Sequence, residues 1–297
     1  MARIRKTATP ERQALSVAKT LQKKGSVISV RTLSNYQERL EQVAFNMQRY
    51  EIEGEIRDLT PESAVTYLEF RGQEIGQKTL DMERQAIQAM MRATGKIEDK
   101  ETLTVIKSEK SQTLRSRAYT QEQVEIVAGS QRDNHALATK IAHAAGLRAH
   151  ELYTLQPANQ RSADKRPTLE TKWQGREGVK YTVEGKGGLI REVLIPSQLA
   201  NQLENTKLPT PVKVSDRGVN YQSHYDIGGG HKWSDSFSKA AKRSLGWSEG
   251  AHGVRHSYAQ ERMHELQTAF LTRDKALETV SQEMGHFRPG ITETYLR

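Results

Sequence analysis

The chain has 297 residues, enough for two ordinary domains, and its 45 lysines and arginines against 36 aspartates and glutamates give a formal net charge of +9. A basic surplus of this size favours a polyanionic partner such as DNA, and the absence of cysteine excludes disulfides, thiolate zinc sites and cysteine nucleophiles. No stretch approaches the roughly 20 apolar residues of a membrane span and the N-terminus lacks an apolar signal core, so we expect a cytoplasmic protein without a membrane partner.

Helical patterns dominate the first hundred residues. The expected helices cover residues 11–24, 32–49, the segment from Thr60-Pro61 onward, and about 78–93. Thr60 followed by proline is a strong helix start, and Thr32 or Ser34 is the expected N-cap of the second helix. Leu15 is expected on the buried stripe of the first helix. These patterns predict a compact helical bundle over residues 1–98.

A polar, charged segment over 99–117 is typical of a linker, and a second domain is predicted over 118–297. It opens with a capping box at Thr120. Two β-rich runs around a glycine-rich turn predict a hairpin over 181–196, and 216–232 is expected to be a loop. Further helices are expected over about 134–145, 234–245, 251–269 and 274–284. The fold class is therefore mainly α with a small β-sheet.

Six residues of the second domain are candidates for chemistry: Arg148, Lys186, His252, Arg255, His286 and Tyr295. Taken singly, each has an ordinary structural interpretation. An arginine at a turn is usually ion-paired, here with Glu151 three residues on. A lysine at a hairpin tip is ordinarily exposed, and an aromatic residue near a terminus often only anchors it.

Two other patterns are weaker candidates for a metal or phosphate site. His252 and His256 are four apart, a spacing that can bind zinc on a helix, but no glutamate follows the first histidine and no third ligand is evident. His224 and His231 flank Gly228–Gly230, where no Lys-Ser/Thr pair follows to make a phosphate cradle. We therefore expect neither a metal nor a cofactor.

Taken in chain order, GLRAHEL, the GKGG hairpin, HGVRHSYA and EMGHFRPGITETYLR resemble the tyrosine recombinase, or integrase, family. That family's pattern is an arginine near the domain start, a lysine on a β-hairpin, a His-x-x-Arg pair, and a Gly-His pair nine residues before a tyrosine. His252 and Arg255 match the pair, and His286 precedes Tyr295 by nine residues. The resemblance covers about 118–297 and implies an α+β catalytic domain preceded by a SAM-like, helical core-type DNA-binding domain.

The resemblance implies a site-specific DNA recombinase, most simply the integrase or excisionase of a mobile element. Tyr295 would cleave and rejoin DNA through a 3′-phosphotyrosyl intermediate, which conserves the energy of the broken bond so that no ATP is needed. Arg148 and Arg255 would clamp the scissile phosphate, because guanidinium forks match two phosphate oxygens and stay charged. His286 would add a third donor.

Proton transfer is assigned by the same resemblance. His252 would assist it at the tyrosine, since a phenol with its ordinary pKa of about 10 is a weak nucleophile at neutral pH. Lys186 would protonate the leaving 5′-oxygen, with nearby Arg176 and Lys180 as alternatives. Glu151 is interpreted as support for Arg148 rather than as a catalytic group.

The expected partner is double-stranded DNA, held between the two domains. Basic residues at the N-terminus and in the linker are the candidates for phosphate contact: Arg3, Arg5, Lys6, Lys23, Lys24, Lys107, Lys110, Arg115 and Arg117. The resemblance further implies a homo-tetramer assembled on DNA, near the nucleoid, with an accessory DNA-bending protein as a possible addition. Family members usually continue past the tyrosine, whereas this chain stops two residues after Tyr295, so we expect either truncation or a different subunit contact.

Two alternatives stay open at this stage. A type IB topoisomerase would share the phosphotyrosine step but relax supercoils alone. A non-catalytic DNA-binding protein with a decayed site is the alternative from a different class. The target sequence, and the choice between integration, excision, inversion and dimer resolution, do not follow from the residues.

Overall fold

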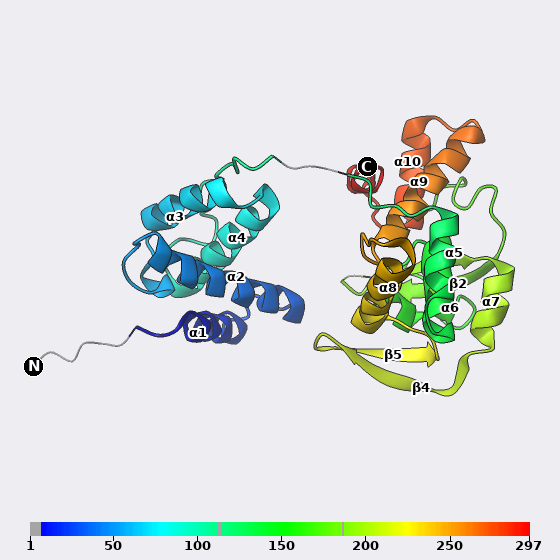
Figure 1. Cartoon of the computed structure of the whole chain (residues 1–297), viewed down its shortest axis with the longest axis horizontal. Helices are drawn as coiled ribbons and strands as arrows, with labels where there is room; N and C mark the ends of the chain where they lie inside the picture. The colour runs from blue at the N-terminus through cyan, green and yellow to red at the C-terminus, as the bar shows by residue number, and fades with distance from the viewer. Residues whose placement is uncertain (1–6, 112–114, 186) are drawn as a thin grey trace, which may run out of the picture. The chain divides into compact units, whose positions relative to one another are not determined.

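The structure is a computed structural model, and it describes residues 7–111, 115–185 and 187–297 (Figure 1). The chain divides into two compact units, Met1–Thr113 and Leu114–Arg297. Each unit has a hydrophobic core of its own. None of the helices in the described ranges combines the length and apolar composition that crossing a bilayer requires.

The first unit is a helical bundle in its described part. Its elements are α1 (Pro10–Lys23), α2 (Val30–Arg49), the 3₁₀ helix η1 (Ile56–Asp58), α3 (Pro61–Glu74) and α4 (Gln77–Thr94). The predicted helices are confirmed, with ends shifted by one or two residues. Thr60 caps α3 as predicted, since its hydroxyl accepts from the amide of Ser63 and the Ser63 hydroxyl accepts from the amide of Thr60.

Two details of the first unit differ from expectation. The N-cap of α2 is Ser29, whose hydroxyl accepts from the amide of Thr32, so the prediction of Thr32 or Ser34 was wrong. All three side chains suit a cap chemically, and the helix simply begins earlier. Leu15 is 43% exposed because the buried stripe of α1 instead contains Ala14, Val17, Ala18 and Leu21, at helical spacing.

A buried polar cluster joins α3 to α4. The Glu83 carboxylate is fully buried and accepts hydrogen bonds from Arg71 and from the hydroxyl of Tyr67. Part of the segment expected as a linker packs on the same bundle. Leu103 is buried in its core and donates its amide to the side chain of Gln88.

The second unit combines helices with two small antiparallel sheets. In chain order it contains α5 (Gln121–Gly129), α6 (Asp133–Ala144), η2 (Glu151–Thr154), β1 (Gln156–Pro157), β2 (Val179–Glu184), β3 (Ile190–Ile195), α7 (Ser197–Glu204), β4 (Lys207–Asp216), β5 (Val219–Tyr225), α8 (Gly230–Leu245), α9 (Gly253–Thr268), α10 (Arg273–Glu283), α11 (Pro289–Thr292) and η3 (Glu293–Tyr295). One sheet has the order β1-β2-β3 and the other pairs β4 with β5.

Most of these elements confirm the sequence-based predictions, including the capping box at Thr120 and the β2–β3 hairpin. The prediction of a loop over 216–232 was wrong. Residues 219–225 form β5, which pairs with β4, and α8 already begins at Gly230. Arg217 and Gly218 form the tight turn between the strands, both with positive φ, as a two-residue hairpin loop requires.

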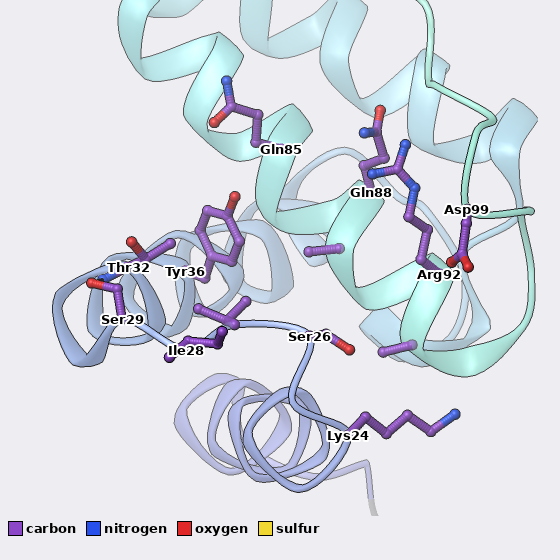
Figure 2. Close-up of a pocket in the computed structure, with 13 residues that line it drawn as sticks. Lys24, Ser26, Ile28, Ser29, Thr32, Tyr36, Gln85, Gln88, Arg92 and Asp99 are labelled. Atoms are coloured by element: carbon purple, nitrogen blue, oxygen red, sulfur yellow. Dashed lines mark hydrogen bonds between the residues drawn. The ribbon is translucent and has the colours of Figure 1, made fainter. Parts of the chain in front are cut away.

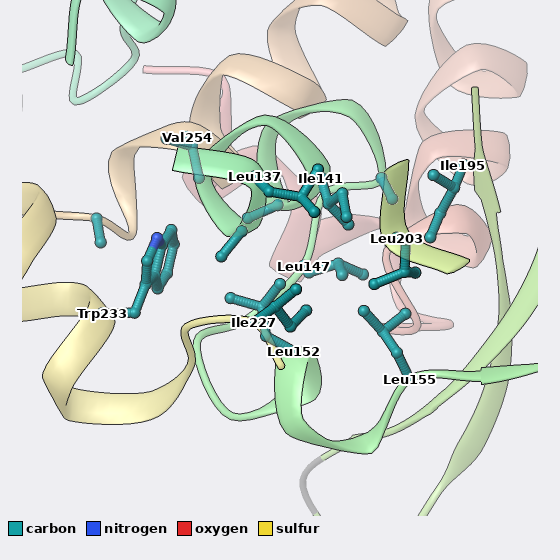
Figure 3. Packing of buried hydrophobic residues seen from close by; sticks show 14 of the residues in the cluster. Leu137, Ile141, Leu147, Leu152, Leu155, Ile195, Leu203, Ile227, Trp233 and Val254 are labelled. Carbon is teal, nitrogen blue, oxygen red and sulfur yellow. The ribbon is translucent and has the colours of Figure 1, made fainter. Parts of the chain in front are cut away.

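The main core of the second unit lies between its helices and its first sheet (Figure 3). Leu137, Ile141 and Leu147 pack there with Trp233 and Val254. A smaller cluster joins α9 to α10 and includes Tyr258, Met284 and Tyr295. The end of the chain is thereby packed onto the same unit that contains Arg148 and Arg255.

Candidate functional site

Arg148 lies in the turn after α6 and is held by Glu151. Its backbone amide donates to Glu151 Oε2 at 2.8 Å, and its Nη1 donates to Oε1 at 2.7 Å. Glu151 is fully buried, whereas the Arg148 side chain is 23% exposed. Burial alone would raise the pKa of Glu151, but the charges of Arg191, Arg255 and Arg148 lower it well below its ordinary value. The carboxylate therefore stays ionised and keeps the guanidinium of Arg148 at the surface of the site.

Arg255 lies in the first turns of α9 and is fully buried. Its guanidinium donates to the carbonyls of Gly146 and Met284 and, at 2.9 Å, to His286 Nε2. Burial and the charge of Arg148 lower its pKa to about 10, so it remains charged at neutral pH. The loop after α6 and the loop after α10 thus meet at one guanidinium group.

Tyr295, in η3, packs against the face of this arginine. Its ring centroid lies 5.5 Å from the Arg255 guanidinium carbon, and its side chain is nearly buried. Three histidine rings surround it, with centroid distances of 5.5 Å to His252, 4.7 Å to His256 and 5.1 Å to His286. A tyrosine, three imidazoles and an arginine therefore form one packed cluster.

The histidines of this cluster are neutral at neutral pH. Burial, together with the charges of Arg255 and Arg148, lowers the pKa of His286 to about 3, and burial with the charge of Arg117 lowers that of His256 to about 4. Desolvation and the charge of Arg255 also lower the pKa of His252, although the residue is exposed. A neutral imidazole beside a phenol can accept its proton.

The structure brings five of the six predicted residues together, and Glu151 contacts Arg148 as expected. Lys186 lies outside the described residues. Its neighbour Gly185 lies against the Arg148–Glu151 pair, since a Cβ there would be 3.4 Å from Glu151 Oε1 and 3.9 Å from Arg148 Nη1. Gly185, directly after β2, is therefore adjacent to Arg148.

The two alternatives to Lys186 are engaged elsewhere in the unit. Arg176 forms an ion pair with Glu265 of α9 at 2.7 Å. Lys180 lies 5.3 Å from the ring centroid of Trp173 and 4.0 Å from the Glu192 carboxylate. In the part of the chain that the structure describes, no three His, Asp or Glu side chains gather as a metal site would require.

Sequence reasoning missed Arg191, on β3. This buried arginine donates to Glu151 Oε2 at 2.8 Å and to the carbonyl of Glu283 at 2.7 Å. It also packs against Gly285, where φ is +71° and a Cβ would collide with the arginine side chain. Arg191 thus connects Glu151, which holds Arg148, to the Gly285-His286 turn. His256 was considered only as a zinc ligand, and its ring is instead the histidine ring nearest to Tyr295.

The residues expected to contact phosphate have different environments. Arg3, Arg5 and Lys6 lie outside the described residues. Four exposed lysines belong to the first unit: Lys23, Lys24, Lys107 and Lys110. Arg115 and Arg117 are bound within the second unit, where both contact Glu249, through its carboxylate and its carbonyl respectively.

Lys24 also lines a groove of the first unit (Figure 2). The groove has a volume of about 950 Å³ and lies between the α1–α2 connection, α2 and α4. Its lining combines polar and apolar side chains and includes Tyr36, Gln85 and Arg92.

Comparison with known proteins identifies the fold. No protein-family model and no curated protein matches the chain. Among solved structures, the XerH site-specific recombinase bound to its palindromic difH substrate matches with a TM-score of 0.58 and 13% identity over 97% of this chain and 93% of that one. The lambda integrase tetramer bound to a Holliday junction matches with a TM-score of 0.58 and 18% identity, over 99% of this chain and 78% of that one.

The Tn1549 transposon integrase, in complex with transposon right end DNA, is a further structural neighbour. Its TM-score is 0.55, at 15% identity over 98% of this chain and 95% of that one. These alignments extend over both units of the chain. The chain therefore has the fold of the tyrosine recombinases and integrases.

Proposed function

We propose that the chain is a site-specific DNA recombinase that cleaves and rejoins DNA through Tyr295. The phenolic oxygen attacks the scissile phosphorus, the bond from phosphorus to the 5′-oxygen breaks, and a 3′-phosphotyrosyl link and a free 5′-hydroxyl result. Attack by a 5′-hydroxyl on that link reverses the step and releases the tyrosine. Exchange of the 5′-hydroxyls between two sites gives recombination, with no cofactor required.

The observation that carries this proposal is the packed cluster around Tyr295. The tyrosine contacts Arg255 and three neutral histidines, and the charge of Arg148 is close enough to lower the pKa of both Arg255 and His286. A phosphate bound there would meet two guanidinium groups, which stabilise the charge that develops on its oxygens. An imidazole is adjacent to accept the phenol proton.

The roles that we propose within the cluster are supported by this geometry and by the family resemblance. Arg148 is partly exposed and would meet the phosphate first. Arg255 lies beneath the ring of Tyr295, so the tyrosine must shift when DNA engages both arginines. His286 would donate to a phosphate oxygen, His252 would accept the phenol proton, and Lys186 would protonate the leaving 5′-oxygen.

The assembly is proposed by analogy with the structural neighbours. These include a recombinase and integrases bound to DNA, one of them a tetramer on a Holliday junction. A homo-tetramer on double-stranded DNA, working in the cytoplasm beside the nucleoid on the ends of a mobile element, is the matching proposal for this chain.

The test traps the covalent intermediate. Wild-type protein is incubated with a pool of randomised duplexes that carry a nick in one strand, so that a short fragment with the 5′-hydroxyl diffuses away after cleavage. We expect an SDS-resistant adduct whose phosphate maps to Tyr295 by peptide mass spectrometry. Tyr295→Phe should bind DNA but form no adduct, whereas Tyr36→Phe, which removes a hydroxyl from the first unit, should form it normally.

Other outcomes would point to the other functions. Absence of an adduct on duplexes that the wild type binds would indicate a non-catalytic DNA-binding protein. An adduct accompanied only by relaxation of supercoiled plasmids, with no joints between two selected sites, would indicate a topoisomerase.

A further inference from the structure

The β4–β5 ribbon has two chemically different faces. Residues opposite each other in an antiparallel pair lie on the same face, and the faces alternate along each strand. Lys213 pairs with Gln222 and Ser215 with Asn220, and all four are exposed, so they form one continuous outer face. The inner face has the half-buried pair of Val214 and Tyr221 at its centre, between the pairs Val212–Ser223 and Asp216–Val219, whose valines are exposed.

The inner face is attached to the segment that contains Arg148. The ring of Tyr221 lies 6.1 Å from that of His150 and 5.8 Å from that of Tyr153, centroid to centroid. His150 follows Arg148 by two residues. The ribbon is therefore fixed beside the candidate phosphate site and is not a free arm.

The turn of the ribbon has a second attachment, at the start of α8. Asp216 Oδ1 accepts a hydrogen bond from the backbone amide of His231 at 3.0 Å, and Arg217 Nη2 donates to His231 Nδ1 at 2.9 Å. With the centre and the turn end of the inner face held, the outer face has a defined direction relative to the second unit. A ribbon held in this way can present side chains in a fixed register.

We propose that the outer face of the β4–β5 ribbon, formed by Lys213, Ser215, Asn220 and Gln222, reads base edges in the major groove of DNA next to the cleavage point. This inference rests on the proposed function. A two-stranded ribbon fits the major groove, and the side-chain types match its code, because asparagine and glutamine pair with adenine and lysine with guanine. Serine can serve as either donor or acceptor.

The reach of the ribbon agrees with this role. The pairs from Asp216–Val219 to Val212–Ser223 extend over five residues of β4, which is about 17 Å at the rise of an antiparallel strand. The two outer pairs, Lys213–Gln222 and Ser215–Asn220, are two residues apart, about 7 Å, which corresponds to about two base pairs at 3.4 Å each. Its outer face contains a cation and no carboxylate, as a DNA-facing surface requires.

The alternative partner for an exposed ribbon is a second copy of this chain. The outer face offers it little, because the four side chains are polar or charged and none is apolar. The centres of protein interfaces are depleted in lysine and serine and enriched in aromatic residues. The composition therefore favours DNA over protein.

The experiment compares base preferences of full-length proteins that all have Tyr295→Phe, so that binding is measured without cleavage. Each protein is used to enrich a pool of randomised duplexes. For Asn220→Ala with Gln222→Ala, we expect discrimination to fall about 5- to 100-fold at a few adjacent base pairs, with preferences elsewhere in the site unchanged. Asn201→Ala with Gln202→Ala removes the same side-chain types from the exposed surface of α7 and should change nothing.

The outcomes separate this inference from the proposed function. A base preference identical to that of the parent, in a variant whose circular dichroism and thermal unfolding are also unchanged, overturns the role of the ribbon and leaves the recombinase proposal standing. An unchanged preference with weakened assembly on DNA, measured by mass photometry, would assign the ribbon to a protein interface instead. A parent that enriches no sequence at all would contradict sequence-specific recombination itself and the inference with it.

Discussion

Glu151 is a fully buried carboxylate shared by two arginines from different elements, Arg148 after α6 and Arg191 on β3. A charge in this position is costly unless it is paired and hydrogen-bonded on every side. The two guanidinium groups and the amide of Arg148 supply that pairing. The position of Arg148 consequently depends on a residue 43 positions later in the chain.

Substitution of Arg191 tests whether the position of Arg148 depends on it. In Arg191→Met the buried carboxylate loses one of the two guanidinium groups hydrogen-bonded to it, and we expect the second unit to lose about 3–5 kcal/mol of stability in urea unfolding. Arg191→Lys should lose less, since the charge remains. Glu192→Gln, on the same strand but only partly buried, should change stability by less than about 1 kcal/mol. An equally small loss for Arg191→Met would contradict a stabilising ion pair between Arg191 and Glu151.

The histidines around Tyr295 predict an acid-sensitive second unit. The pKa values of His286 and His256 are lowered from 6.5 to about 3 and about 4, so between these values and 6.5 the unfolded chain binds more protons than the folded one. Stability is therefore expected to fall as the pH decreases below about 6.5, by up to about 1.4 kcal/mol per pH unit for each histidine. His252 should contribute less, because the residue is exposed to solvent.

Urea unfolding between pH 7 and pH 4.5 measures this slope. His256→Asn should reduce it, whereas His264→Gln, which alters an exposed histidine of the same helix, should leave it unchanged. Equal slopes in the two variants would show that the buried rings are not responsible.

The spacing of residues was sufficient to predict which side chains the structure brings together, with Glu151 beside Arg148, but not the part of Arg191. Arg148, His252, Arg255, His286 and Tyr295 occur in short motifs whose order and intervals are visible in the sequence. Arg191 gave no such signal, because an arginine within IREVLI fits the exposed face of an ordinary strand. Its burial depends on Glu151 and on the Glu283 carbonyl, and both contacts arise only from tertiary packing.

At the level of elements, the capping box of α3 offers a local test. Thr60→Ala removes the acceptor for the amide of Ser63 and should destabilise the first unit by about 1 kcal/mol, a shift of about 4–8 °C in its melting temperature. Thr66→Ala, at an exposed position of the same helix, should be neutral or slightly stabilising. Equal shifts in calorimetry would indicate that the cap contributes nothing.

Helices were predicted more accurately than the second sheet for a physical reason. The helices show buried stripes at a period near 3.6 and have capping residues at their ends. β4 contains two prolines and is largely exposed on both faces, so its sequence lacks the alternation that identifies a strand. Its existence depends on pairing with β5 and on the contact of Tyr221 with His150 and Tyr153.

For the whole molecule, the two separate cores predict two separate unfolding events. The core of the first unit ends at Leu103. Both hydrophobic clusters of the second unit lie at or beyond Tyr119. We expect two transitions in calorimetry of the full chain. Thr60→Ala should move one of them and Arg191→Met the other; a variant that moves both equally would show that the units unfold together.

The contact between Gly285 and Arg191 has a consequence for related sequences. Position 285 has no room for a side chain while an arginine occupies position 191, and its backbone geometry also favours glycine. The two positions should therefore evolve as a pair. In a lineage that retains the arginine the glycine should persist, and replacement of the glycine should occur only in lineages where position 191 has already become smaller.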